Sequence, residues 1–499
     1  MADPKQAKVL LAEIPANDSF KAMEEITFWL ESLNRTEGFK LDRRFELLDQ
    51  LDQAGKNHHR KLNQDYLAQR LQKFQENRLW TTVFEFWRHL GAGYIACVEG
   101  YQAGAAGSLS IRGDLPVISA RALRALSLQL KWVLLRYGPV DDRVWGDIGR
   151  IFLFAESKGF VNKSTQIYPG AHGVSTVTQE FLKAMMLSAS STDGLQPAQL
   201  EIAERTIAHF SPQFVFDTKP SDACNYYFDL SMRKPPSRVI KKADITPTMR
   251  FFGAGKAAEG LAGLTQTLVA QGVLPSDVNL GGTYDAATVI EVLKHLAMYW
   301  SATPPARNSE RRRATARLTI VHGFADVLRH ADSFGSDSLD FSGEGLESWV
   351  VENVSEGGYG ALVPAVKGDW LKIGSLLGLK TDAAPHWSAG VVRRITRDEQ
   401  QARRVGIQVV ARTAVPVRLS PVGPGSSVNA TREGEGALLL SASPDSNGDI
   451  SVMLRVDSFT PSQVLEMEVL GRVYVLKSAR LVEASQEYDL AKFKFTVKT

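Results

Sequence analysis

The chain has 499 residues, of which 44% are hydrophobic and 23% are charged, and its formal net charge is +3. This composition excludes a largely disordered protein, and no apolar run approaches the roughly eighteen residues that a membrane helix needs, so no membrane span is expected. The nearly balanced charge also argues against a nonspecific nucleic-acid binder, and no nucleic-acid partner is expected.

Cysteine usage and the start of the chain predict a cytoplasmic protein. Cys97 and Cys224 lie far apart and have no Cys or His neighbours at metal-ligand spacing. This pattern indicates a reducing compartment and no structural zinc. Residues 1–6 lack the basic leader that precedes the apolar stretch of a secretory signal.

Residues 20–300 have helical periodicity, and we predict an all-α domain over residues 1–301. Apolar residues recur on one face of the helix expected over 118–137, namely Ile118, Ala122, Leu126 and Leu130. That helix is expected to end at Gly138-Pro139, because proline cannot continue it. Three prolines within residues 234–250 indicate an extended connector and a possible sub-boundary.

Three places in this half resemble parts of catalytic or metal motifs, and none completes one. Residues 252–256 read Phe-Gly-Ala-Gly-Lys, which is half a phosphate loop without the required spacing. His58 and His59 are adjacent, point about 100° apart on a helix, and are interpreted as solvent-facing. His172 lies near Ser175, but no nucleophile elbow surrounds the serine. We therefore expect no catalytic residue, no metal site and no enzyme, although folding can bring distant residues together.

The segment Ala302-Thr-Pro-Pro marks the boundary to a β-rich half, because consecutive prolines restrict the chain to extended geometry. Five arginines follow within residues 307–317. Short β-branched runs punctuated by Gly, Pro and Asp then continue to about residue 412, a pattern typical of a small antiparallel barrel. We predict a domain over residues 302–412.

Two short polar motifs stand out in this domain. The first, Arg313-Ala-Thr-Ala-Arg317, precedes the apolar run 318–321. Arginine can fork onto phosphate oxygens or onto the edge of guanine. The second motif, Asn353-Val-Ser-Glu-Gly-Gly358, offers an amide, a hydroxyl and two glycines, which we expect to allow positive φ and close approach of a ligand. Together the motifs indicate a nucleotide-binding site.

In this order the motifs resemble the signature of the PilZ domain family, bacterial receptors for cyclic di-GMP: RxxxR followed by [D/N]xSxxG. The resemblance covers about residues 307–412 and implies cyclic di-GMP as the ligand and no other cofactor. It also implies the following roles: Arg313 and Arg317 contact phosphates and a guanine, Asn353 reads a guanine edge, Ser355 contacts a phosphate, and Gly358 allows close approach. Arg312 lies outside the matched pattern and is a further candidate contact.

Two features depart from the family pattern. The family often has Asp where this chain has Asn353, which loses the charge that strengthens a bond to guanine. Residues 329–348 form a long insert between the motifs, which we interpret as a solvated loop. The alternative for the arginines is a solvated basic linker, and for Asn353 and Ser355 it is a turn that bonds its own backbone.

Residues 413–499 are expected to form a second β-rich domain, a barrel or a sandwich, with no ligand motif. Alternating strands are predicted over 436–441, 450–456, 464–470, 472–476 and 493–497. The predicted fold class is therefore an α+β multidomain protein: an all-α N-terminal half, a PilZ-like small antiparallel β-barrel, and a second β-rich C-terminal domain.

The sequence favours a cytoplasmic cyclic di-GMP-binding effector that is not an enzyme. In this interpretation the PilZ-like domain binds the second messenger, and the helical half, which resembles no family that we recognise, contacts an unidentified protein partner. One alternative is a PilZ-like interaction scaffold without nucleotide binding. Another is an unrecognised helical hydrolase with a regulatory barrel. The oligomeric state stays open.

Overall fold

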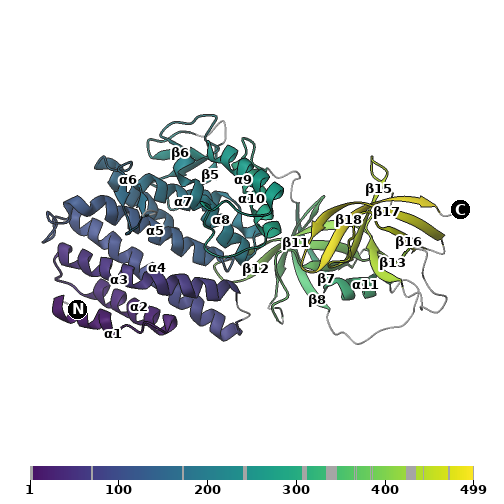
Figure 1. The fold of residues 1–499 in the computed structure, drawn as a ribbon, viewed down its shortest axis with the longest axis horizontal. Coiled ribbons are helices and arrows are strands. Elements are labelled where there is room, and N and C mark those ends of the chain that lie inside the picture. Colours follow the sequence, from purple (N-terminus) through teal and green to yellow (C-terminus); the bar gives the residue numbers. More distant parts are fainter. Residues whose placement is uncertain are drawn as a thin grey trace. The chain divides into compact units, whose positions relative to one another are not determined.

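The structure is a computed structural model with two compact units, Met1–Ala306 and Arg307–Thr499 (Figure 1). It describes residues 4–68, 71–170, 173–239, 244–305, 312–332, 346–364, 366, 368–382, 384, 386–422, 434–441, 443–469 and 472–497. The two units are described one at a time below.

The first unit is built mainly from helices, which confirms the predicted helical character of the first half. The helices are α1 (Pro4–Glu13), α2 (Ser19–Arg35), α3 (Leu41–Ala68), α4 (Lys73–Gln102), α5 (Leu115–Leu134), α6 (Asp142–Ser157), α7 (Val177–Ala189), α8 (Pro197–Phe210), α9 (Ala257–Gln271) and α10 (Ala286–Trp300). Helix α5 is buried on almost all sides and packs against α4, α6 and α7. A helix with apolar residues on most of its faces packs in the centre of a bundle.

This unit is not all-α, which corrects the sequence prediction. Strands β3 (Val215–Asp217), β4 (Tyr226–Asp229), β5 (Ser237–Arg238) and β6 (Met249–Gly253) form an antiparallel sheet in the order β3-β6-β4-β5. The short strands β1 (Thr165–Gln166) and β2 (Val174–Ser175) form a second pair. Residues 234–250, interpreted as a connector, contribute β5 and the start of β6. A Cβ at Gly253 would overlap the backbone of Ala223, so sheet packing accounts for this glycine without a phosphate loop.

The second unit begins with a closed antiparallel barrel, as the sequence predicted. Its strands are β7 (Arg312–His322), β8 (Glu347–Ser355), β9 (Gly358–Val363), β10 (Leu376–Thr381), β11 (Ser388–Arg397) and β12 (Arg403–Ala411). Helix α11 (Phe324–Asp332) follows β7 and includes the start of the insert that we interpreted as a loop. Its apolar side is buried, because Phe324, Val327 and Ala331 pack into a core cluster. Residues 333–345 of the insert lie outside the described residues.

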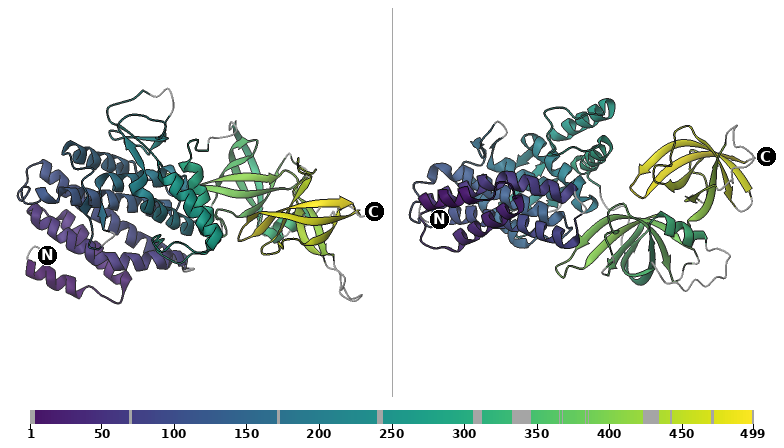
Figure 2. Two further views of the ribbon diagram at one scale, coloured as in Figure 1. Left: turned by 45° about the horizontal axis from the view of Figure 1, so that its top comes forward. Right: turned by 60° about the horizontal axis from the view of Figure 1, so that its bottom comes forward.

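A second closed barrel follows, which decides between the barrel and the sandwich left open by the sequence. Its strands are β13 (Val415–Pro421), β14 (Glu435–Leu439), β15 (Asp449–Arg455), β16 (Val464–Val469), β17 (Arg472–Ala484) and β18 (Tyr488–Val497). Numbered one to six within each barrel, the strands have the same circular order, 1-2-3-6-5-4, in both. In both barrels the hairpin of strands five and six also has two register shifts. The second barrel therefore repeats the topology of the first. Figure 2 shows the first barrel in green and the second in yellow.

The two barrels share a core and are joined by polar contacts. Helix α11 packs against β13 and β14, and its apolar residues cluster with Leu438, Met453 and Tyr488 of the second barrel. Arg393 of β11 donates two hydrogen bonds to the Glu483 carboxylate of β17, over 2.8 and 2.7 Å. The barrels therefore form one body, consistent with their assignment to one compact unit.

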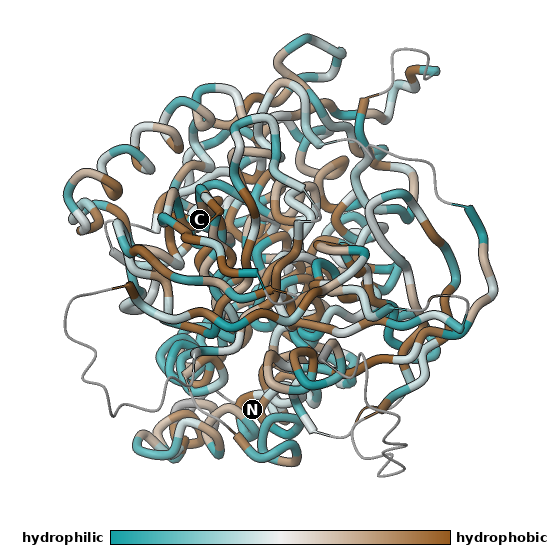
Figure 3. The backbone as a smooth tube through the Cα atoms, turned by 90° about the vertical axis from the view of Figure 1, so that its right-hand side faces the viewer, coloured by the Kyte–Doolittle hydropathy of each residue, from teal (hydrophilic) through white to brown (hydrophobic). Residues whose placement is uncertain are grey.

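Hydrophobic and hydrophilic positions alternate along the helices and strands (Figure 3). None of the helices in the described ranges is long and apolar enough to cross a membrane. The division into domains at residues 301/302 and 412/413 stays a prediction.

Candidate functional site

The two motifs lie side by side on neighbouring strands at the start of the first barrel. Strand β7 carries the arginines and pairs with β8, which carries the second motif, so that Arg313 lies directly opposite Asn353. Arg312 pairs with Val354, and Arg317 pairs with Val350. Residues directly opposite each other in an antiparallel pair have neighbouring side chains on one face. The structure therefore brings together the arginine end of β7 and the polar end of β8.

A β-bulge separates the two motif arginines. The register shifts between Arg313 and Ala316, so that two residues of β7 oppose Glu352 of β8. Bulges bend a strand and redirect its side chains. Arg312, Arg313 and Arg317 are exposed, and none of them forms a hydrogen bond or ion pair with another described residue. Their guanidinium groups are available to an anionic ligand.

A nearby arginine, in contrast, is paired with carboxylates. Arg404 of β12 donates to both oxygens of Glu352, over 3.2 and 3.0 Å, and also contacts Asp398. The hydrogen bond to Glu352 is the main cause that raises the pKa of Arg404. The carboxylate closest to the bulge is therefore already neutralised and does not compete for the motif arginines.

Asn353 lies across a glycine of the next strand. It pairs with Gly360 of β9, and a Cβ at Gly360 would come within 2.6 Å of both amide atoms of Asn353. The absence of a side chain at Gly360 therefore permits this position of Asn353. Within the described part of the chain, the Asn353 amide forms no hydrogen bond, and Ser355 donates only a long one, 3.4 Å, to the Gly358 carbonyl. Both side chains keep most of their hydrogen-bonding capacity for a ligand.

Glycine is required at position 358 for a different structural reason from the one expected. Neither Gly357 nor Gly358 has a positive φ, so that part of the sequence interpretation is wrong. A Cβ at Gly358 would overlap the carbonyl oxygen of Ile407 on β12. The glycine therefore permits close approach of β12 to β9, which closes the barrel.

Arg412 is a candidate that the sequence analysis missed. It follows β12, and its guanidinium donates to the Glu356 carbonyl over 3.3 Å, in the turn that follows Ser355. Gln408 of β12 pairs with Gly358, so the end of β12 runs past this turn. No motif marks Arg412, because its position depends on the closure of the barrel by β12.

The structure assigns other roles to the residues considered for catalysis or metal binding. His59 is buried, contrary to the prediction, and its ring meets Trp87 edge to face at 4.8 Å. Burial lowers the pKa of His59 well below its usual value. Ser175 donates to Glu180 over 2.7 Å, and His172 lies outside the described residues. No group of three His, Cys, Asp or Glu side chains suited to a metal occurs in the described ranges.

Comparison with known families gives two matches, in separate parts of the chain. Residues 346–416 match the family described as "Cyclic-di-GMP receptor FimW, middle PilZ domain". These residues form a PilZ domain. Residues 5–221 match "Cyclic-di-GMP receptor FimW, N-terminal domain", within the helical unit for which the sequence indicated no family. A comparison with curated proteins finds no match.

The PilZ domain is thus the one recognised from the two motifs, and that recognition is confirmed. The matched range contains β8 to β12 with Asn353, Ser355 and Gly358, and it begins after the arginines of β7. Both matched families carry the description of a cyclic di-GMP receptor.

Proposed function

We propose that this protein is a cyclic di-GMP receptor whose PilZ domain binds the ligand beside the β7–β8 pair. The observation that carries the proposal is the register of Arg313 opposite Asn353, with the guanidinium groups of Arg312, Arg313 and Arg317 unpaired in the described structure. A ligand with two phosphates and two guanines requires clustered cations and a nearby amide. The descriptions of the two matched families support this ligand.

The roles of the individual residues follow the PilZ resemblance. Arg313 and Arg317 bind phosphate oxygens and a guanine edge, and Asn353 reads the edge of a guanine. Ser355 donates to a phosphate oxygen, and Gly358 acts indirectly, because it lets β12 approach β9 and close the barrel beside the site. Arg312 and Arg412 add cationic contacts at the two ends of the site, because Arg312 begins β7 and Arg412 touches the turn after Ser355.

The protein acts by binding and not by catalysis in this proposal. The PilZ domain senses cyclic di-GMP, and the helical unit is the output part that contacts an unidentified protein partner. Both functions fit a receptor, because the two units are separately compact and each can present its own surface.

Calorimetric titration of the full chain with cyclic di-GMP tests the proposal. One charge-assisted hydrogen bond contributes roughly 1.5–3 kcal/mol, so Arg317→Ala should weaken binding at least about tenfold. Arg418→Ala is a matched control, because Arg418 is an exposed arginine on β13, the corresponding first strand of the second barrel. It should leave the affinity unchanged.

Two outcomes would contradict the assignment. An unchanged affinity in Arg317→Ala would remove Arg317 from the site. If the unmodified protein gave no binding signal, the alternative of a PilZ-like interaction scaffold without a nucleotide would replace the receptor, and the Asn353 departure from the family's Asp would be its natural explanation.

A further inference from the structure

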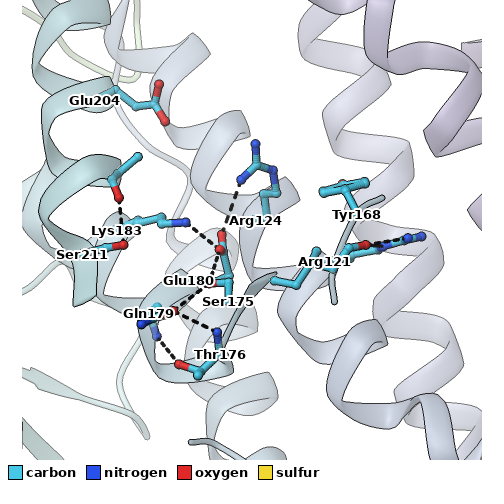
Figure 4. A network of polar contacts seen from close by, with 12 residues as sticks. Arg121, Arg124, Tyr168, Ser175, Thr176, Gln179, Glu180, Lys183, Glu204 and Ser211 are labelled. Carbon is cyan, nitrogen blue, oxygen red and sulfur yellow. Dashed lines mark hydrogen bonds and ion pairs between the residues drawn. The ribbon is translucent and has the colours of Figure 1, made fainter. Parts of the chain in front are cut away.

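The helical unit encloses a cluster of charged side chains around α5, separate from the PilZ domain (Figure 4). Three cations, Arg121, Arg124 and Lys131, lie on one side of this buried helix, because their spacing of three and seven residues brings them within about one quarter of a turn. Charged side chains inside a protein are normally paired and hydrogen-bonded. We therefore compare the hydrogen bonds and ion pairs of each cation to find any that lacks partners.

Arg121 and Lys131 are fully engaged. Arg121 donates to the Ile167 carbonyl over 2.9 and 2.7 Å, to Asp49, and to the Tyr94 hydroxyl over 3.0 Å. Lys131 has no exposed surface and forms ion pairs with Glu201 and, at 3.2 Å, with Glu204. Both cations have the structural role expected of a buried charge.

Arg124 is not engaged in this way. Its ion pair with the Glu180 carboxylate spans 3.8 Å, and it forms no hydrogen bond with any residue that the structure describes. The Tyr168 ring lies 5.4 Å from its guanidinium. About a third of the Arg124 side chain, 35%, is exposed, so the unused N–H groups can be reached from solvent.

Glu180 is already committed to other partners. Its Oε1 accepts from Lys183 over 2.6 Å and from Ser175 over 2.7 Å. Its Oε2 has no hydrogen-bond partner, although the residue is only 1% exposed. Figure 4 shows Arg124 and Lys183 both approaching this one carboxylate. A buried acceptor and an accessible set of donors therefore lie side by side, and neither is satisfied.

The ion pairs at Glu180 do not balance. Two cations, Arg124 and Lys183, pair with this one carboxylate, whereas Lys131 and Arg205 share two carboxylates, Glu201 and Glu204. Arginine keeps its proton in proteins, so Arg124 cannot relieve the excess by becoming neutral. Burial lowers the pKa of Arg124, but Glu180, Tyr168 and Glu204 raise it more, and the pKa lies above its usual value.

We propose that Arg124 and Glu180 form a second binding site, in the helical unit, for a protonated phosphate group, either free or at the monoester end of a small molecule. The guanidinium of Arg124 binds the charged phosphate oxygens, which compensates the excess positive charge. Oε2 of Glu180 is buried beside Arg124 in this structure, and it accepts from the phosphate hydroxyl once the Arg124 side chain has moved toward the ligand. A single small group that both accepts and donates supplies the hydrogen bonds that Arg124 and Oε2 of Glu180 lack.

This site is distinct from the proposed cyclic di-GMP site by chemistry as well as by location. The phosphates of cyclic di-GMP are diesters and carry no hydroxyl, so they cannot donate to Glu180. Sulfate has the shape of phosphate and the charge of its doubly charged form, but it carries no proton near neutral pH. Comparison of phosphate with sulfate therefore tests the role of Glu180 without any mutation.

Thermal unfolding of the full chain tests the proposal, with inorganic phosphate or sulfate added at constant ionic strength and about pH 6.5, where phosphate groups are partly protonated. Phosphate should raise the melting temperature in a saturable manner, at several-fold lower concentration than sulfate, because a ligand of the native state stabilises it. Arg124→Gln should weaken the response at least about tenfold.

Two further variants serve as controls. Arg150→Gln changes an exposed arginine of the same unit, which pairs with Glu99 and Asp147, and should respond to phosphate like the unmodified chain. Arg317→Ala should also respond normally, because it lies in the PilZ domain. An equal response to phosphate and sulfate, an unsaturable response, or an unchanged response in Arg124→Gln would each overturn the proposal. The anion comparison remains decisive if Arg124→Gln does not fold.

Discussion

At the scale of single residues, the arginines of this protein differ in how far their guanidinium groups are used by the protein itself. Arg121, Arg393 and Arg404 are bound by carboxylates or carbonyls. Arg313 and Arg317 form no hydrogen bond or ion pair with other residues in the described ranges. Because the sequence shows only that arginine is present, it cannot separate these two groups, and the structure is needed to find those open to a ligand.

The Gly360–Asn353 contact gives a residue-scale prediction. In Gly360→Ala, the added methyl group would come within 2.6 Å of the Asn353 amide and displace it from the site. We expect cyclic di-GMP to bind several-fold more weakly, while the barrel stays folded because the amide end of Asn353 can move. Calorimetry in an Asn353→Ala background provides the control: there, Gly360→Ala should have no further effect. A further loss of affinity in that background would show that Gly360 acts by another route.

The charge cluster of the helical unit gives a second residue-scale prediction. Lys131→Met leaves the buried Glu201 and the largely buried Glu204 without one of their partners, and loss of one member of a buried ionic cluster costs about 3–5 kcal/mol. Arg124→Met removes the excess cation and should change the free energy of unfolding by less than about 1 kcal/mol. Urea unfolding followed by the helical circular dichroism signal measures both. Equal losses in the two variants would contradict the charge imbalance.

At the scale of elements, the sequence indicated most of the helices and strands, but not the register with which the strands close each barrel. Alternating runs predicted the strands of both barrels, and the two motifs indicated that Arg313 and Asn353 belong to one site. The bulge between Arg313 and Ala316 and the approach of Arg412 were not predictable, because they depend on register between distant strands. The small sheet β3-β6-β4-β5 was missed because its strands have only two to five residues.

The contact between the hairpins β11–β12 and β17–β18 gives an element-scale prediction. Arg393→Ala removes two hydrogen bonds to Glu483, whose remaining partner is the Tyr488 hydroxyl at 2.7 Å. Because both side chains are partly exposed, solvent screening limits the expected loss of stability to about 1–2 kcal/mol. Differential scanning calorimetry should show a lower melting temperature for the barrels. Arg404→Ala, which breaks a more exposed pair within the first barrel, should have a smaller effect, and the reverse order would contradict the proposed role of Arg393.

At the scale of the whole molecule, the motif arginines lie close to the boundary between the two compact units, after Ala306. A ligand bound there can shift the arrangement of the units, but only as far as it prefers one arrangement over another. We expect small-angle scattering curves of the full chain to differ with and without saturating cyclic di-GMP. At a ligand concentration close to the Kd of the unmodified protein, Arg317→Ala should give a curve closer to the ligand-free one. Identical curves for the unmodified protein at saturation would leave a receptor that signals by another mechanism.

A side chain at position 358 would overlap the Ile407 carbonyl, and this packing requirement affects how sequence signatures of this kind are used to search genomes. A requirement imposed by strand packing would persist in a relative that has stopped binding any nucleotide, because the barrel would still have to close. In a sequence search, the glycine of the signature therefore identifies proteins that close this barrel, whereas the arginines before it identify proteins that bind the messenger. A survey that scored these positions separately would divide active receptors from purely structural copies.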